Sequence, residues 1–133
     1  MIDIEDEVYR RVKASVAAGH DAYITSEYVS VPPRFPCVFV EESDNYAMQE
    51  TASTSTNENH AVLMYEVSVF SNKRAGKKTE CKEIMATVDT AMNGMGFTRI
   101  SMNTVPNQYD ASVCRMVARY RAVVSREHII YRR

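Results

Sequence analysis

Apolar side chains recur every three or four positions in two segments of the chain, and this spacing predicts two amphipathic helices. In the N-terminal segment the apolar stripe consists of Ile4, Val8, Val12 and Val16. The segment opens on acidic residues, which favour the positive end of a helix dipole, so we expect Asp3 to cap this helix. Gly19 is expected to end it.

The second helical segment starts around residues 72–78. Its apolar stripe consists of Cys81, Ile84, Met85, Val88 and Met92. Methionine in such a stripe is typical of core packing rather than of a ligand site. Gly94 is expected to end this helix.

Runs of β-branched and aromatic residues, several of them alternating with polar residues, predict strands between and after the helices. The expected strands cover residues 22–31, 37–42, 62–71, 98–105 and 113–125, with a short one over 129–131 as a further candidate. The resulting order is α-β-β-β-α-β-β. It predicts an α+β fold over residues 1–133, a single two-layer domain whose mostly antiparallel sheet carries both amphipathic helices on one face.

Residues 43–61 separate the second and third strands and lack a sustained period, because Ser, Thr, Asn and acidic side chains dominate them. A polar loop of this length inside a compact domain is usually functional or mobile. One hypothesis is that the loop orders against a neighbouring subunit, with Tyr46 and Met48 as candidate contacts. The alternative is a connection without a role.

The last long strand, residues 113–125, carries three arginines. Side chains alternate between the two faces of a strand. The even positions form an apolar row that we expect to face the helices: Cys114, Met116, Ala118, Tyr120, Ala122 and Val124. The odd positions mix arginine with valine, and the candidate interface residues among them are Arg115, Val117, Arg119, Arg121 and Val123.

Three environments would suit this mixed row. Protein interfaces combine apolar area with arginine, a DNA channel would carry more basic residues and fewer valines, and an exposed sheet face would leave the arginines in solvent. We expect a subunit interface, with the acidic half of an adjacent copy as the partner. Passing double-stranded DNA is expected only as a weak, non-specific contact.

Charge is distributed unevenly along the chain. Residues 1–66 hold 12 acidic and 4 basic side chains, while residues 67–133 hold 5 acidic and 12 basic ones, so the two halves carry −8 and +7. Such a subunit is suited to head-to-tail contact with copies of itself, unless folding mixes the two charge types on one surface. Apolar residues at 45% and charged residues at 25% indicate a globular protein rather than a disordered or fibrous one.

The longest apolar runs are far shorter than the roughly 20 residues that cross a bilayer. The acidic start also differs from a signal peptide, so we expect synthesis and retention in a cytoplasm and no membrane partner. The cysteines Cys37, Cys81 and Cys114 have no CxxC spacing and are expected to be reduced and buried.

No catalytic or cofactor motif is recognisable, so we predict no enzyme activity, catalytic residue, metal or cofactor. The three histidines stand at no metal-ligand spacing from one another or from a cysteine. Glu41 and Glu42 alternate along a strand and cannot form a two-acid site by themselves. A thiol and a histidine brought together by folding remain an open alternative.

A basic patch lies where the second helix is expected to start, and it consists of Lys73, Arg74, Lys77 and Lys78. The N-terminus of a helix also favours anions, so this patch is a candidate contact for a phosphate or an acidic partner. The alternative is a solvated face.

Three stretches in order carry a resemblance to a known family: PPRFPCVFVEE, YEVSVFSNKRAGKKTECKEIMATVDTAMNGMGF and PNQYDASVCRMVARYRAVVSREHIIYRR. They combine an FP-containing strand, an aromatic-rich strand that passes through an SN turn into a helix ended by GF, and a terminal RYR strand that closes on a tyrosine. This ordered set resembles the small tail-terminator, or tail-to-head joining (tail completion), proteins of long-tailed bacteriophages.

The resemblance implies a structural virion protein of the neck, assembled in the cytoplasm of a bacterial host. It implies a homo-oligomeric ring, commonly a hexamer, on the end of the tail tube, with the tail tube protein and a head-completion or connector protein as partners. A head-completion or adaptor protein of the same neck is the alternative within this class. A nucleic-acid-binding module and a thiol or acid/base enzyme are the alternatives from other classes.

Overall fold

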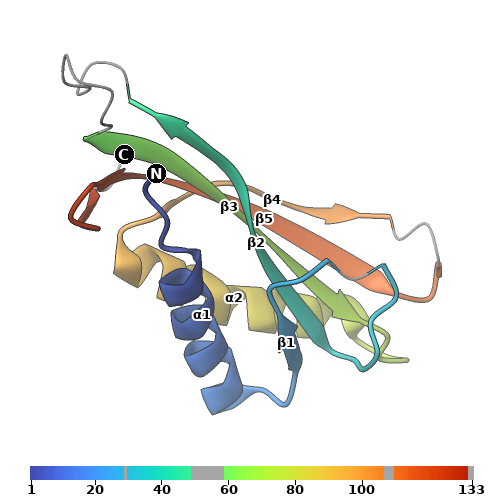
Figure 1. Ribbon diagram of the computed structural model, residues 1–133. Helices are drawn as coiled ribbons and strands as arrows, with labels where there is room; N and C mark the ends of the chain where they lie inside the picture. The colour runs from blue at the N-terminus through green and yellow to red at the C-terminus, as the bar shows by residue number, and fades with distance from the viewer. Residues whose placement is uncertain (29, 49–58, 107–109, 132–133) are drawn as a thin grey trace.

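The computed structural model describes residues 1–28, 30–48, 59–106 and 110–131, and in them two helices lie against one six-stranded sheet (Figure 1). The elements in chain order are α1 (Glu5–Gly19), β1 (Tyr23–Thr25), β2 (Cys37–Ala47), β3 (His60–Ser71), α2 (Lys77–Met95), β4 (Thr98–Val105), β5 (Cys114–Ser125) and β6 (Ile130–Tyr131). The sheet order is β1-β2-β3-β5-β4, and β6 pairs with the end of β5. Within the described strands only β1 and β2 pair in parallel. The α+β fold expected from the sequence is confirmed.

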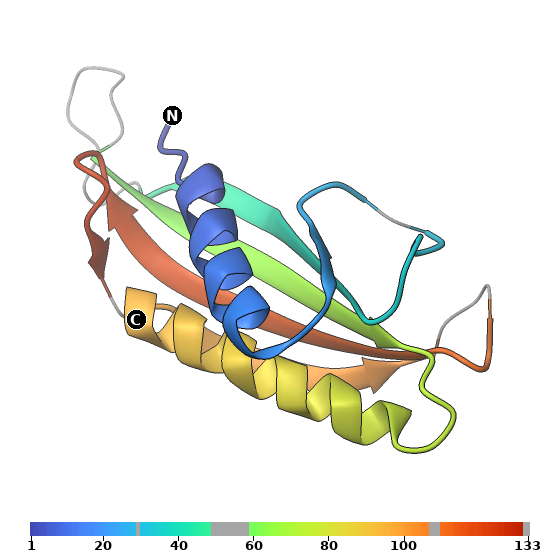
Figure 2. The ribbon, with the colours of Figure 1, turned by 90° about the horizontal axis from the view of Figure 1, so that it is seen from below.

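Both helices cover the same face of the sheet, as two perpendicular views show (Figures 1 and 2). Val8, Val12 and Val16 of α1 are fully buried. The buried stripe of α2 contains all the residues expected from its period: Cys81, Ile84, Met85, Val88 and Met92. The even positions of β5 belong to the same core cluster, so the prediction that this row faces the helices is confirmed.

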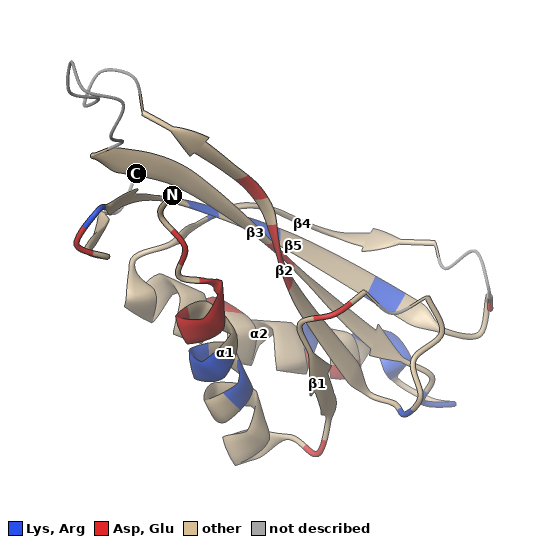
Figure 3. Ribbon diagram, in the orientation of Figure 1, with Lys and Arg blue, Asp and Glu red and all other residues tan. Residues whose placement is uncertain are grey.

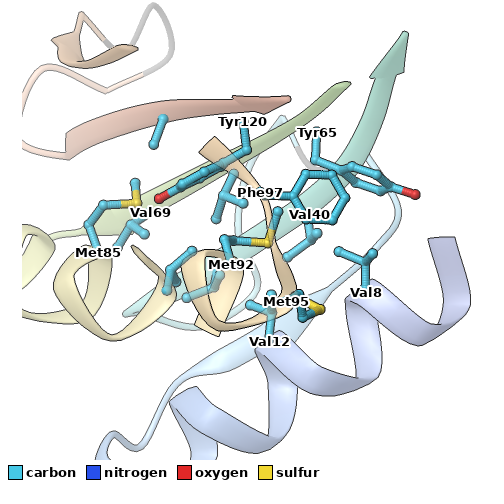
Figure 4. Packing of buried hydrophobic residues seen from close by; sticks show 14 of the residues in the cluster. Val8, Val12, Val40, Tyr65, Val69, Met85, Met92, Met95, Phe97 and Tyr120 are labelled. Carbon is cyan, nitrogen blue, oxygen red and sulfur yellow. The ribbon is translucent and has the colours of Figure 1, made fainter. Parts of the chain in front are cut away.

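Three aromatic side chains fill the centre of the core (Figure 4). The rings of Tyr65 and Phe97 meet edge-on, with 5.3 Å between their centroids, which is a favourable arrangement of their quadrupoles. Tyr120 is almost completely buried, and its hydroxyl donates to Asp89 Oδ1 of α2 at 3.1 Å. This bond satisfies the one polar atom of the side chain and ties β5 to the helix layer.

The helix ends differ in detail from the sequence expectation. Ile4 occupies the cap position of α1, although the Asp3 carboxylate still accepts a hydrogen bond from the Glu5 N–H at 3.0 Å. The helix α2 does not end at Gly94. It continues to Met95 and ends at Gly96, whose φ of 108° is readily adopted only by glycine.

The first two strands also have other bounds than expected. The strand predicted over residues 22–31 ends at Thr25, because the Thr25 hydroxyl accepts a hydrogen bond from the Glu27 N–H and the chain bends there. In contrast, β2 continues beyond the predicted 37–42 to Ala47, with a bulge between Glu42 and Asp44.

The expected loop over residues 43–61 is therefore shorter than predicted. Residues 44–47 pair with β3, and the Met48 N–H donates to the His60 carbonyl at 2.9 Å. Polar residues are accommodated here because Asn45 Nδ2 donates to the Ile2 carbonyl at 2.8 Å. The segment 49–58, on which the hypothesis of a loop ordering against a neighbour depends, lies outside the described residues.

Candidate assembly surface on the outer sheet face

The outer face, defined as the side of the sheet opposite the two helices, carries a row of charged side chains across its middle. Glu41 of β2 pairs with Glu66 of β3, and Glu66 pairs with Arg119 of β5. The Arg119 guanidinium lies 2.9 Å from Glu66 Oε1. Basic and acidic side chains are therefore already mixed on this face within one subunit. The ribbon shows acidic and basic positions on neighbouring strands (Figure 3).

The three arginines of β5 have three different environments. Arg119 is held by Glu66, as described above. Arg115 donates to Ser68 Oγ at 3.3 Å, and its guanidinium lies 5.5 Å from the centroid of the Phe70 ring. Its Nε is buried and has no hydrogen-bond partner among the described residues. Arg121 makes no ion pair or side-chain hydrogen bond with any residue of the described ranges, so its charge is available to a partner.

The two valines predicted to join this interface are not accessible. Val117 is exposed to 1% and Val123 to 6%, although both lie on the expected face. A residue that is already buried in its own subunit has no area left to bury against another one. Val117 and Val123 therefore offer little area for a contact, and the interface predicted on this strand remains a prediction that rests on its arginines.

A small second core lies on the same face and includes another valine of the odd row, Val113. It consists of Cys37, Phe39, Phe70 and Val113, with Tyr23 and Phe35 packed against it. The three members in β2 and β3 lie on the outer face, at the end of the sheet where β1 is located. Val113 is therefore buried by packing within the subunit, which a single strand pattern does not distinguish from packing between subunits.

The neighbouring carboxylate of Glu66 affects the pKa of Glu41. Burial raises the pKa of Glu41, and a hydrogen bond and like charge from Glu66 raise it further, while the positive charge of Arg115 lowers it. From the sequence, Glu41 was compared only with its chain neighbour Glu42. The true partner, Glu66, is 25 residues away, and only the register of β2 against β3 reveals it.

An aromatic pair flanks the opposite end of the outer face. Tyr46 pairs with Val62, Val62 with Val123, and Val123 with Tyr131, so these four side chains form one row across the sheet. Both tyrosines are 46% exposed, whereas the valines between them are buried. Tyr46 therefore remains a candidate contact, as part of β2 rather than of a loop, and Met48 follows directly after the strand.

The basic patch lies at the start of α2, as expected. Lys73, Arg74 and Lys78 are exposed and Lys77 is half-buried. No side chain of the described residues caps this helix end. The patch is located at the end of β3 that pairs with the beginning of β5, so Arg115 is the nearest of the three arginines along the sheet.

The three cysteines are buried and pack in the two cores. Burial raises the pKa of the Cys37 thiol to about 11 and that of Cys81 to about 12, so both are thiols at neutral pH. Cys81 Sγ lies 3.5 Å from the carbonyl oxygens of Val69 and Cys114. Among the described residues, no three His, Cys, Asp or Glu side chains are arranged to hold a metal ion.

Membrane insertion through a helix finds no support in the described ranges. Neither α1 nor α2 combines the length and the apolar character that a membrane-spanning helix needs.

Comparison with known proteins identifies the fold. No protein-family model and no curated protein matches the sequence. A chain in the virion of a native gene transfer agent particle aligns with a TM-score of 0.60 and 16% identity, over 89% of this chain and 91% of that chain. The sheath/tube terminator of an extracellular contractile injection system, in its extended state, aligns with a TM-score of 0.51 and 9% identity.

The second alignment covers 96% of this chain but 60% of the terminator, so this chain spans less than two thirds of that protein. At these identities the likeness concerns the fold. The resemblance to tail terminators stated from the sequence is confirmed at that level, because a solved terminator shares the fold over nearly the whole chain.

Proposed function

We propose that this protein is a structural component of a phage-like virion and acts as a tail terminator. Residues 1–133 serve as one tail-terminator-like domain, and copies of it form a ring that caps the tail tube and joins the tail to the head connector. The role requires no catalysis, cofactor or metal. The ring is proposed to be a hexamer, and the finished location is the neck of the particle.

The observation that carries this proposal is the fold shared with a sheath/tube terminator over 96% of the chain. The likeness to a gene transfer agent virion chain, which covers nine tenths of both chains, supports the same class of particle. Three sequence stretches that resemble tail terminators support it independently of the fold.

The surface supports a binding role rather than a reaction. Arg121 has no ion-pair partner among the described residues, and Tyr46 and Tyr131 expose about half of their surface at one end of the outer face. Arginine and tyrosine are enriched in protein interfaces. By contrast, all three thiols are buried, and burial raises the pKa of Cys37 and Cys81, which opposes their use as nucleophiles.

A head-completion or adaptor protein of the same neck is the second candidate, as the alternative that the sequence resemblance leaves open. The two are distinguished by order of assembly. A terminator binds finished tails in the absence of heads, whereas an adaptor binds DNA-filled heads in the absence of tails.

The test is to supply the purified protein to tails and to heads from a producing strain that lacks its gene. We expect the protein to bind tail ends, to be visible there as a ring by electron microscopy, and to restore joining to heads. Binding to heads alone would support the adaptor function. Binding to neither would contradict both functions.

Double-stranded DNA is proposed only as a weak, non-specific contact of the assembled ring. Tight binding of DNA by the isolated subunit, falling steeply with salt, would instead favour a nucleic-acid-binding module. A fluorescence anisotropy titration at two salt concentrations distinguishes these cases.

A further inference from the structure

The two edges of the sheet differ in the contacts that the rest of the chain makes with them. On the side of β1 and β2, α1 occupies the edge with its side chains. The Tyr9 hydroxyl donates to the Ile24 carbonyl at 3.1 Å, and the Glu5 carboxylate accepts a hydrogen bond from the Glu42 N–H at 3.0 Å. These bonds use backbone groups that another strand would need, so this edge is protected against strand addition.

On the opposite side, β4 is the edge strand, and its free backbone groups can be identified from the pairing. The backbone N–H of Glu42 points away from β3. Tyr65 is paired with Glu42, so the backbone N–H and C=O of Tyr65 point to β5. Because the direction of these backbone groups alternates along antiparallel strands, the backbone N–H and C=O of Arg119 point to β4. One strand further, the N–H groups of Met102 and Thr104 point to the open side. No hydrogen bond within the described residues uses either N–H group.

The open edge is protected over its first half only. Edge strands are normally short or bulged, or carry lysine, proline or inward-pointing charges that prevent pairing with other chains. The strand β4 has a bulge between Arg99 and Ser101, and Arg99 points to the helix layer, where it pairs with Asp89 of α2 at 3.3 Å. The second half, residues 102–105, carries no charged residue, proline or bulge. Ile100 and Met102 expose 51% and 40% of their surface. Such an edge is expected to be completed by another strand.

A candidate strand is exposed on the far side of the same subunit. Tyr28 and Val31 follow β1 and are 74% and 67% exposed. They belong to the stretch 22–31, whose composition predicts a strand although the strand in the subunit ends at Thr25. Since β1 and β4 are at opposite ends of the sheet order, a contact between these two regions is head-to-tail. Head-to-tail contacts repeated by rotation close a ring.

We propose that in the assembled ring β4 pairs with the stretch carrying Tyr28 and Val31 in an adjacent copy of this chain. The inference rests on the proposed function and names the contact through which its ring closes. Main-chain hydrogen bonds to Met102 and Thr104 supply the pairing, and the exposed Ile100 and Met102 side chains supply apolar area. A pairing of β4 with itself would give a two-fold dimer, which cannot extend into a ring.

A proline substitution tests the backbone contact. Thr104→Pro removes an N–H group on the open side and leaves the ladder to β5 intact, a position at which edge strands tolerate proline. We expect the variant to keep the melting temperature of the wild type and to lose the ring in native mass spectrometry. The control Thr104→Val retains the N–H group and is expected to form rings. A folded Thr104→Pro variant that forms rings as the wild type does overturns the inference.

A cysteine pair tests the partner even if the proline variant does not fold. The double variant Val31→Cys/Ile100→Cys is expected to give, on oxidation, a ladder of cross-linked species up to the full ring, while the three native cysteines are buried and do not react. Rings that show no cross-link overturn the assignment of the partner stretch. A dimer formed by Ile100→Cys alone overturns it in favour of two-fold pairing.

These outcomes are separable from failure of the proposed function. If wild-type protein forms rings on tails but the two tests fail, only the edge contact is wrong. If wild-type protein neither forms rings nor binds tail ends, the terminator function itself is wrong.

Discussion

Arg119 and Glu66 face each other across β5 and β3, and their side chains form an ion pair of 2.9 Å on the outer face of the sheet. The pair lies beside a second carboxylate, that of Glu41. An arginine that the sequence analysis names as a candidate interface residue is therefore engaged within its own subunit. This finding separates Arg119, with a structural partner, from Arg121, which has none among the described residues.

We predict a small coupling energy between Arg119 and Glu66. Their side chains are 44% and 18% exposed, and pairs at such positions contribute about 0.2–1 kcal/mol because solvent screens them. A double-mutant cycle with Arg119→Gln and Glu66→Gln, followed by urea unfolding, measures it. The same cycle with Arg121→Gln in place of Arg119→Gln is the control and should show no coupling.

Aspartate in the stripe of α2 should unfold the protein. Ile84 is 1% exposed and Val88 is fully buried, so Ile84→Asp or Val88→Asp would place an unpaired charge in the core. The matched control is Ala86→Asp, on the exposed side of the same helix. Circular dichroism should show loss of cooperative melting for the first two variants and an almost unchanged transition for the control. Normal melting of Val88→Asp would contradict the core assignment.

The two glycines near the end of α2 should respond in opposite ways to alanine. Gly96→Ala places a side chain at a φ of 108° and 2.9 Å from Ile130 Cγ2, so we expect a loss of at least about 1–2 kcal/mol. Gly94 lies inside the helix with open space around it, so Gly94→Ala should stabilise the protein by about 0.5–1 kcal/mol. Thermal unfolding of the two variants measures the difference, and equal effects would contradict this view of the helix end.

Periodicity was sufficient to predict the layers of this fold. The helical stripes and the even row of β5 are long and uniform, so the faces that enter the core could be identified before any pairing was known. The position of helix ends was less predictable, because Gly94 and Gly96 are two residues apart and only the backbone angle distinguishes them. The extension of β2 to Ala47 was missed because its pairing depends on a bulge and on a hydrogen bond from the Asn45 side chain to the Ile2 carbonyl.

Only part of the candidate site could be predicted, because its contacts depend on the register between strands. The face to which the arginines of β5 point follows from alternation, and it is correct. Their partners follow from the register between strands that are far apart in the chain, which the sequence of one strand does not contain. The ion pair to Glu66 and the burial of Val117 both depend on that register.

The raised pKa of Glu41 predicts a change of stability with pH. A carboxyl whose pKa is higher in the folded than in the unfolded state binds its proton more tightly when folded, so its stabilising contribution is present at low pH and is lost as the pH rises through the folded pKa. Glu41→Gln removes this effect. We expect the variant to gain stability relative to the wild type as the pH rises above the usual carboxyl range, because repulsion from Glu66 is then absent.

The melting temperatures of both proteins are measured between pH 4 and pH 8, a range that includes the ordinary carboxyl pKa of about 4.3. Glu66 and Glu5 act on Glu41 in the same direction, while Arg115 acts against them. A constant difference between Glu41→Gln and the wild type across the range would show that Glu41 does not titrate as described.

Arg121 provides the sharpest test of whether the outer face contacts another subunit. Reversing its charge in Arg121→Glu removes no ion pair or side-chain hydrogen bond of the described residues, so the subunit should fold and melt as the wild type does. If an acidic surface of a neighbouring copy contacts this arginine, the variant should fail to form rings, since like charges at an interface cost several kcal/mol. The control is Arg126→Glu, which makes the same change of charge at an exposed position after β5. Rings that form normally from Arg121→Glu, measured by native mass spectrometry, would mean that this arginine faces solvent or the lumen of the ring, and a loss of DNA affinity in the same rings would then select the lumen.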